Sequence, residues 1–216
     1  MEKIRKKMFF MGAGLIAVFV LWTVLVSYVD VRAIGPNGSS VGFATLNGYV
    51  HDLTGVNMRL YSITDWLGLV PIGVAFGFAV LGLVQWIKRK SLFKVDRGIL
   101  ALGGFYVAVM AVYILFEYVV INCRPTLIDG YLEASYPSST TMLVMCAMPT
   151  AMMQLHARIK SDVFRRCVLI SIAAFTAFMV IGRLASGVHW LTDIIGATLV
   201  SAGLVITYAS LSDIHK

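Results

Sequence analysis

The stretch "MEKIRKKMFFMGAGLIAVFVLWTVLVSY", residues 1–28, decides the class of fold. It opens with four basic side chains among seven residues, and the run at 9–28 that follows carries no charge. A transmembrane helix needs about 20 predominantly apolar residues, which is the length of this run. It is too long for the apolar region of a secretory signal, and no small-residue cleavage site follows it. We therefore expect a retained membrane helix.

Five further apolar runs follow, at residues 66–87, 99–121, 138–155, 167–184 and 191–211. Across the 216 residues, 59% are hydrophobic and only 13% are charged, which is far more apolar than an ordinary soluble domain. No internal repeat or long linker divides the chain. The sequence predicts an all-α fold, an integral membrane bundle of six transmembrane helices, in a single domain over residues 1–216.

The positions of Lys and Arg predict the orientation, because cytoplasmic loops are rich in these residues. Most of the 18 basic residues precede the first helix, lie between helices 2 and 3 or 4 and 5, or stand at Lys216; the exceptions are Arg32, Arg59, Arg124 and Arg183. We expect both ends on the cytoplasmic side of a bacterial cytoplasmic membrane. The net charge of +7 then faces anionic lipid and requires no nucleic-acid partner.

The outer segment at residues 29–65 is the longest between predicted helices. It begins with turn residues and then places apolar side chains three and four apart, at Phe43, Leu46, Tyr49, Val50 and Leu53. This spacing predicts a short amphipathic helix at the membrane surface, either a lid for a site or an anchor. His51 and Asp52 lie on it, but an isolated His-Asp pair is a weak functional signal.

Two arginines, Arg124 and Arg183, lie at the outer ends of apolar runs, where an ionisable residue is costly unless it is paired or functional. From Arg183 the chain reads "RLASGVHWLTDIIG", with His189 and Asp193 four apart. On one helix face, the carboxylate would accept from one imidazole nitrogen and leave the other as a base or nucleophile. The alternative is a set of interfacial polar residues with Asp193 at a helix N-terminus; three such residues so close together favour the functional interpretation.

The segment "EASYPSSTT", residues 133–141, precedes the fourth apolar run. Ser138 and Ser139 at the head of that helix could direct hydroxyl and backbone N–H groups toward an anion, as helix N-termini do for phosphate. An ordinary helix cap would also use serine here. This segment alone does not distinguish anion binding from an ordinary helix cap.

Together these segments resemble the type 2 phosphatidic acid phosphatase family. That family carries Lys, six residues, Arg-Pro; then Pro-Ser-Gly-His; then Ser-Arg, five residues, His, three residues, Asp. Here the three elements read Glu117, six residues, Arg124-Pro125; Pro137-Ser138-Ser139-Thr140; and Gly182-Arg183, five residues, His189, three residues, Asp193. The order and spacing match, and two residue types differ.

The resemblance implies catalytic roles for two residues: His189 would attack phosphorus and form a phosphohistidine, and Asp193 would orient it. It implies phosphate contacts from Arg124, Ser138, Ser139 and Arg183. It implies no cofactor and no metal, and Glu117, His189 and Asp193 are not a recognisable ligand set. The three cysteines, Cys123, Cys146 and Cys167, also lack metal-site spacing, so packing is their expected role.

Thr140 and Glu117 are the departures from the family pattern. Thr140 stands where the family has its general acid, and a hydroxyl cannot take that role near neutral pH. Glu117 replaces a Lys; seven residues before Arg124, it could form an ion pair with that arginine or, if buried, act as an acid. We favour the ion pair.

Two functions follow. The first is a membrane lipid phosphatase acting at the outer face on a lipid phosphate, in particular a diphosphate such as polyprenyl diphosphate. The second is a catalytically impaired relative that binds a lipid phosphate or a membrane-protein partner. The sequence does not indicate the oligomeric state.

Overall fold

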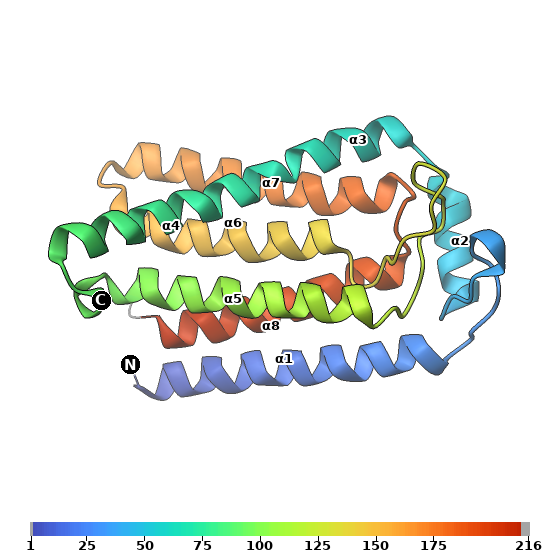
Figure 1. Ribbon diagram of the computed structural model, residues 1–216, viewed down its shortest axis with the longest axis horizontal. Helices are drawn as coiled ribbons and strands as arrows, with labels where there is room; N and C mark the ends of the chain where they lie inside the picture. The colour runs from blue at the N-terminus through green and yellow to red at the C-terminus, as the bar shows by residue number, and fades with distance from the viewer. Residues whose placement is uncertain (1, 213–216) are drawn as a thin grey trace.

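The computed structural model describes residues 2–212, which fold into a bundle of helices (Figure 1). Six long helices form the bundle: α1 (Glu2–Tyr28), α4 (Leu69–Arg89), α5 (Arg97–Tyr118), α6 (Ser139–Arg158), α7 (Asp162–Ala185) and α8 (Leu191–Leu211). Two shorter helices, α2 (Ala44–Thr54) and α3 (Met58–Leu67), and two 3-10 turns, η1 (Pro36–Gly38) and η2 (Leu92–Lys94), complete the helical elements of residues 2–212. Lys216, used above for orientation, lies outside the described residues.

Several helices extend beyond the apolar runs from which they were predicted. α1 begins at Glu2, where Glu2 and Lys6 form an i,i+4 ion pair of 2.8 Å. α7 begins at Asp162, because the Ser161 hydroxyl caps its first turn by accepting from Phe164 N. Charged and capping residues therefore continue the helices past the hydrocarbon region. α5 differs in the other direction, since it ends at Tyr118 rather than at residue 121.

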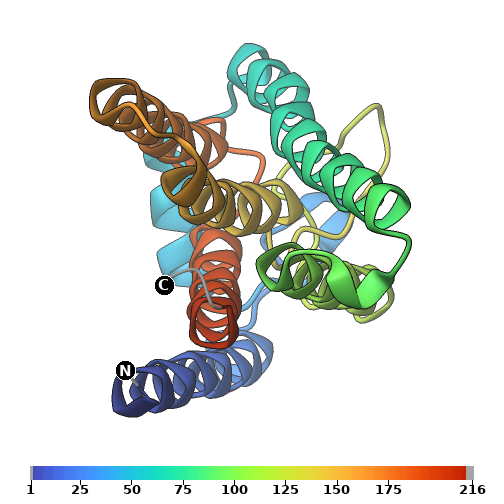
Figure 2. The same ribbon diagram turned by 90° about the vertical axis from the view of Figure 1, so that its left-hand side faces the viewer.

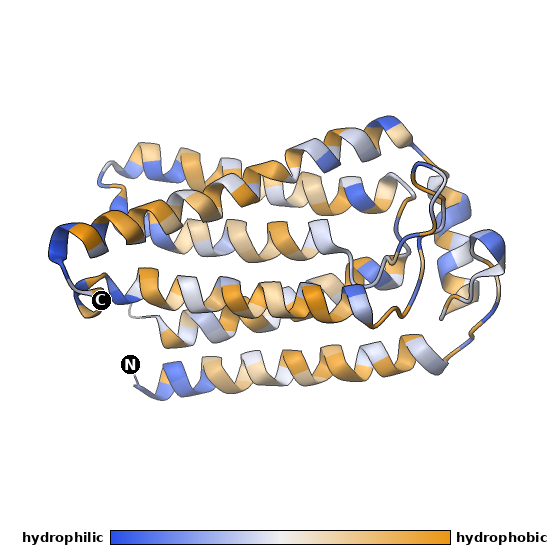
Figure 3. Ribbon diagram, in the orientation of Figure 1, coloured by the Kyte–Doolittle hydropathy of each residue, from blue (hydrophilic) through white to orange (hydrophobic). Residues whose placement is uncertain are grey.

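The long helices confirm the prediction of an all-α integral membrane bundle. Five helical segments within residues 2–212 are long and apolar enough to cross a membrane, and α3 with α4 makes one of them. Figure 3 shows apolar residues along the middle of the bundle and hydrophilic residues toward its two ends. Among the long helices described, α6 is outside this set of five.

α6 is less apolar because it lies inside the bundle, where it packs against α4, α5, α7 and α8 (Figure 2). Its buried face includes Thr150 and Gln154, which are 0% and 1% exposed. Gln154 Nε2 donates to the Tyr208 hydroxyl at 2.6 Å, and the Thr150 hydroxyl donates to the carbonyl of Cys146 at 2.8 Å. Polar side chains are tolerated in a membrane helix when they find partners inside the bundle.

α1 and α8 pack closely along their length and run in opposite directions. A Cβ atom at Gly12 would lie 2.9 Å from the carbonyl oxygen of Gly203, so the two backbones approach each other here. At one end of the pair, Arg5 Nε donates to Ser210 O at 2.9 Å. The start of α1 therefore lies beside the end of α8.

α2 lies at the other end of the bundle, against the start of α8 (Figure 1). Asn47 is fully buried and makes a two-way contact: its Nδ2 donates to Thr192 Oγ1 at 2.9 Å and its Oδ1 accepts from Thr192 N at 3.2 Å. The apolar residues Leu46, Tyr49 and Leu53 are exposed. One face of α2 thus contacts the N-terminus of α8, and another face exposes apolar side chains. The location of α2 at a membrane surface stays a prediction.

Candidate functional site

Arg124 is positioned by a hairpin-like loop that follows α5. Arg124 N donates to the Glu133 carbonyl at 2.9 Å, and Ser135 N donates to the Asn122 carbonyl at 2.9 Å, so two extended segments run side by side. Arg124 was expected at the outer end of the apolar run at 99–121; α5 ends earlier, so Arg124 lies six residues beyond the end of that helix. The loop folds back toward the bundle and brings Arg124 to the loop between α7 and α8.

Two arginines converge on one nitrogen of His189. Arg124 Nη1 lies 3.2 Å and Arg183 Nη2 lies 3.4 Å from His189 Nε2. All three are buried, with exposures of 8% for Arg124, 1% for Arg183 and 3% for His189. The structure thus brings together three residues that the sequence places 65 and 6 positions apart.

The surroundings of His189 favour its neutral form. Burial lowers the pKa of His189 well below 6.5, and the charges of Arg124 and Arg183 lower it further. A guanidinium has only donors, so Nε2 must accept and its lone pair must point at the arginines. The ring proton is then on Nδ1. This is the tautomer that a nucleophilic Nε2 requires.

Asp193 stands behind the ring. Its Oδ2 lies 3.6 Å from His189 Nδ1 and accepts from Trp190 N at 2.9 Å, while its Oδ1 is 3.5 Å from Asn122 Nδ2. Asp193 therefore caps α8 and also faces the imidazole, so the structural and orienting roles coexist. His189 itself precedes α8, which begins at Leu191, and the predicted shared helix face is wrong in that detail.

α3 covers the arginines with residues that sequence reasoning missed. The Tyr61 ring centroid is 4.9 Å from the Arg183 guanidinium carbon and 6.0 Å from that of Arg124. Arg183 Nη1 lies 3.4 Å from Thr64 Oγ1 and 3.5 Å from Asp65 Oδ1. Tyr61 and Asp65 are four apart just before an apolar run, and that spacing was the available signal.

The loop supplies a second carboxylate. Glu133 Oε2 lies 2.9 Å from Arg124 Nε, outside hydrogen-bonding geometry. The side chains of Glu133 and Asp65 are 45% and 56% exposed, so both acids stand at the mouth of the site rather than in it. Each arginine therefore meets a solvated carboxylate on its outer side and a neutral imidazole on its inner side.

Buried polar atoms in this cluster lack hydrogen-bond partners. Within residues 2–212 they include Arg124 Nε, Arg183 Nε and His189 Nδ1. Arg124 Nε and His189 Nδ1 nevertheless face the carboxylates of Glu133 and Asp193, at 2.9 Å and 3.6 Å. The two guanidinium groups supply the charge and the donors that an anion of phosphate type would need. Among the same residues, no group of three His, Cys, Asp or Glu side chains is arranged to hold a metal.

Ser138 is the N-cap of α6. Its fully buried hydroxyl donates to Thr141 Oγ1 at 3.0 Å and accepts from Thr141 N at 3.4 Å, and its backbone N donates to the Asp193 carbonyl at 3.2 Å. The hydroxyl thus serves the helix, and the backbone joins α6 to α8 next to the imidazole. Ser139 is the first residue of α6. Their contact with phosphate stays a prediction.

The two departures from the family pattern lie apart from the arginines' polar contacts. Thr140 Cγ2 is 3.5 Å from where a Cβ at Gly68 would be, so its methyl faces the junction of α3 and α4. Glu117 lies beside Tyr113 on α5 and lines a small cleft with Ser139. The ion pair that Arg124 makes is with Glu133, not with Glu117, because α5 ends before Arg124 and the expected helical spacing is lost.

A backbone contact connects α3 to the histidine loop. Gly187 has a φ of +67°, and a Cβ atom there would overlap the carbonyl oxygen of Gly55. Next to it, Asn57 N donates to the Ser186 carbonyl at 2.9 Å. The linker between α2 and α3 therefore sits directly on the loop that carries His189, which is possible only because residue 187 has no side chain.

Comparison with known proteins identifies the family and the fold of this chain. The PAP2 superfamily model matches residues 98–215. No curated protein sequence matches the chain. The crystal structure of a transmembrane PAP2-type phosphatidylglycerolphosphate phosphatase from Bacillus subtilis is similar in fold, with a TM-score of 0.54 and 19% identity over 92% of this chain and 93% of that one. The resemblance inferred from the three sequence elements is confirmed: the chain belongs to the PAP2 superfamily.

Proposed function

We propose that this protein is a membrane lipid phosphatase that acts through a phosphohistidine. The observation that carries the proposal is the convergence of Arg124 and Arg183 on the Nε2 lone pair of His189. Two buried cations beside a neutral nucleophile suit a phosphoryl group, whose oxygens would bind the guanidinium groups while its phosphorus faces Nε2. Membership of the PAP2 superfamily and the fold of the bacterial phosphatase support the same function.

The chemistry proceeds in two steps. His189 Nε2 attacks phosphorus, the bond from phosphorus to the leaving oxygen breaks, and a phosphohistidine forms. Arg124 and Arg183 stabilise the charge on the phosphoryl oxygens, and Asp193 stabilises the Nδ1–H of the ring that becomes positive. Water then attacks the phosphohistidine, which releases inorganic phosphate and returns the neutral imidazole.

The leaving group points to a diphosphate. General acid catalysis contributes about 10²- to 10⁴-fold, roughly 3 to 5 kcal/mol, and Thr140 supplies none. An alkoxide leaves poorly without a proton, because an alcohol has a pKa near the ~15.7 of water. A phosphate monoester released from a diphosphate has a second pKa of about 6 and leaves without one. A lipid diphosphate such as polyprenyl diphosphate is therefore the proposed substrate.

Phosphate binding must loosen the contacts that Asp65 and Glu133 make with the arginines. Both carboxylates are about half exposed and can turn into water, whereas Arg183 and His189 are fixed in the interior. The acids thus hold the guanidinium groups in place in the unliganded protein and give way to a dianion, which has more charge and more acceptor oxygens.

We place the site at the outer face of a bacterial cytoplasmic membrane. This rests on the distribution of Lys and Arg, which crowd the end of the bundle opposite His189. A substrate with its tail in the bilayer would bring its phosphate to the arginines from the membrane side.

The test is phosphate release from polyprenyl diphosphate and from phosphatidic acid in mixed micelles. Wild type should release phosphate from the diphosphate, and His189→Ala should lose at least about 10⁴-fold in rate, because it removes the nucleophile. His156→Ala is the matched control, since His156 is exposed at the far end of α6. Thr140→His should raise the rate on the monoester most, because that substrate needs the proton.

The second candidate is the impaired relative that binds a lipid phosphate without hydrolysis. Thr140 and the occupied arginines favour it. No phosphate release from either lipid by wild type, together with lipid binding that Arg183→Gln abolishes, would establish it in place of the phosphatase.

A further inference from the structure

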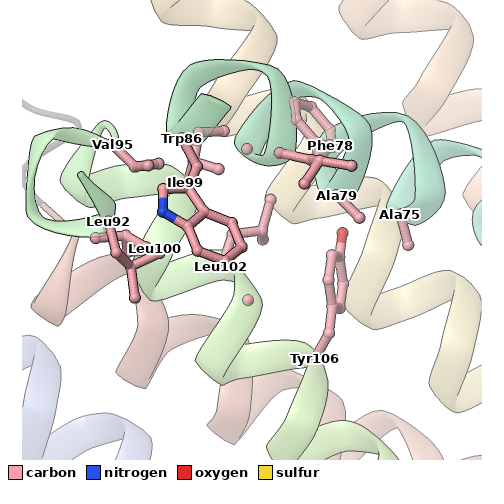
Figure 4. Close-up of a pocket in the computed structure, with 13 residues that line it drawn as sticks. Ala75, Phe78, Ala79, Trp86, Leu92, Val95, Ile99, Leu100, Leu102 and Tyr106 are labelled. Atoms are coloured by element: carbon pink, nitrogen blue, oxygen red, sulfur yellow. The ribbon is translucent and has the colours of Figure 1, made fainter. Parts of the chain in front are cut away.

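A groove separates α4 from α5 at the end of the bundle opposite the phosphate site (Figure 4). Its volume is about 300 Å³, which is within the range of ligand sites in proteins. Figure 4 shows side chains of both helices facing the space between them, with the 3-10 turn η2 at one end. Those that define it are Phe78, Trp86, Leu92, Ile99, Leu102 and Tyr106.

Small residues leave this space open. Ala75, Ala79 and Gly82 line it from α4, and Gly103 lines it from α5. A Cβ atom at Gly82 would already be 3.0 Å from Ile99 Cγ2, whereas one at Gly103 would meet nothing within 4 Å. The two helices therefore touch at Gly82 and leave room beside Gly103.

The groove suits hydrocarbon. Its lining is apolar apart from the Tyr106 hydroxyl and the Trp86 indole N–H, and that hydroxyl lies 3.2 Å from Thr150 Oγ1, which gives it a partner within the protein. Both walls belong to segments that are long and apolar enough to cross a membrane. A narrow apolar groove in that position is in contact with bilayer lipid, and an acyl chain is the ligand of matching shape and polarity.

The end of the groove is positively charged. Lys88, Lys90 and Lys94 are exposed around the turn that joins α4 to α5. Arg89 lies 2.9 Å from Asp96, so that acid is already engaged. Between the lysines, Phe93 is 94% exposed, as expected for a side chain inserted among lipid headgroups. Basic residues beside a membrane segment attract anionic headgroups.

We infer that this groove binds one anionic phospholipid, with an acyl chain between α4 and α5 and the headgroup phosphate at Lys88, Lys90 and Lys94. The site is distinct from the arginine cluster and stands whether or not the protein is a phosphatase. Along the groove, the acyl chain packs against α4 and α5 where these helices do not contact each other. It thereby holds the α3–α4 segment, which carries Tyr61 and Asp65, against the bundle.

The experiment uses the full chain in bilayers of equal phosphatidylglycerol and phosphatidylcholine, with retained lipids counted by native mass spectrometry. Gly103→Leu fills the groove, and Gly104→Leu is the matched control: a Cβ at Gly104 also meets nothing within 4 Å, but Gly104 does not line the groove. Wild type and Gly104→Leu should keep one phosphatidylglycerol that Gly103→Leu loses.

A second variant avoids the helix interior. Replacing the three exposed lysines by glutamine, in K88Q/K90Q/K94Q, should weaken phosphatidylglycerol binding on the order of 100-fold and remove its preference over phosphatidylcholine. Equal retention by Gly103→Leu and Gly104→Leu, or an unchanged lipid preference in the lysine variant, would overturn the inference. So would a wild-type dimer, seen in the same spectra, that Gly103→Leu dissociates, because the groove would then hold a second copy of the chain.

Discussion

The two ends of the bundle differ in polarity and in the space left between side chains. At the arginine cluster, charged side chains are buried and there is no room for a further carbon atom at Gly187. At the groove between α4 and α5, the walls are apolar and a carbon atom at Gly103 meets nothing within 4 Å. We propose that an anion completes the first and that hydrocarbon completes the second. The arginine cluster would take the phosphate of a lipid, and the groove would take an acyl chain. The two regions should therefore respond differently to the same kind of substitution.

The largest contrast is between two glycines. Gly187→Ala adds one carbon where backbone conformation and the Gly55 carbonyl both oppose it, and should cost about 3 kcal/mol or more of stability. Gly103→Leu adds four carbons to open space and should leave the unfolding temperature in detergent nearly unchanged. Gly130→Ala is the control for backbone strain alone: its φ is +83° but nothing lies within 4 Å, so about 1 kcal/mol is expected. Equal losses at 187 and 103 would remove the contrast.

Arg183→Lys tests the charged end. A lysine keeps the charge but cannot span Thr64, Asp65 and His189 with one planar group, so kcat/KM for the lipid diphosphate should fall about 10²- to 10³-fold. Arg59→Lys, at an exposed position on α3, should leave the rate unchanged. A similar loss in both variants would mean that α3, rather than the guanidinium, limits the reaction.

Asp65→Asn tests whether the acids at the mouth compete with phosphate. An ion pair this exposed is worth about 1 kcal/mol or less, so the inhibition constant of inorganic phosphate should fall by about two- to fivefold, meaning tighter binding. Asp52→Asn, on the exposed part of α2, serves as the control. Weaker phosphate binding in Asp65→Asn would show that Asp65 positions Arg183 rather than competing for it.

The pH dependence of stability tests the environment of His189. Because the folded pKa of His189 lies below the 6.5 of a free imidazole, the unfolded chain takes up this proton first as the pH falls. His189 therefore does not oppose folding above pH 6.5 and destabilises the fold increasingly as the pH drops below it toward the folded pKa. Unfolding temperatures between pH 8 and pH 5 should fall less steeply in His189→Gln than in wild type or in the exposed-site control His156→Gln.

Four residues that lie together in the candidate site were singled out from the sequence because charge stands out in an apolar sequence. Arg124, Arg183, His189 and Asp193 are costly at a membrane face, and the cost itself is the signal. Asp65 and Glu133 gave no such signal, since acids in polar segments are ordinary. The pairing of Arg124 with Glu133 depends on where α5 stops, and helix ends are set by tertiary contacts such as those of the hairpin.

The groove could not be predicted at all. Glycine and alanine in an apolar helix are equally compatible with close helix contact and with a gap. Gly12 shows the first outcome, where α1 meets α8, and Gly103 shows the second. The difference arises from the distance between helices, which no local pattern encodes. In contrast, the membrane helices followed directly from apolar length, because hydrocarbon thickness fixes it.

The hairpin that holds Arg124 has a further consequence. Its tip turns at Asp129 and Gly130, both with positive φ, and Tyr131 beside them is 74% exposed. The two extended segments that lead from this tip also hold the arginine, through the hydrogen bond from Arg124 N to the Glu133 carbonyl. An antibody fragment raised against the tip would bind the same hairpin that holds Arg124. We therefore expect such a fragment to alter the proposed reaction without entering the bilayer.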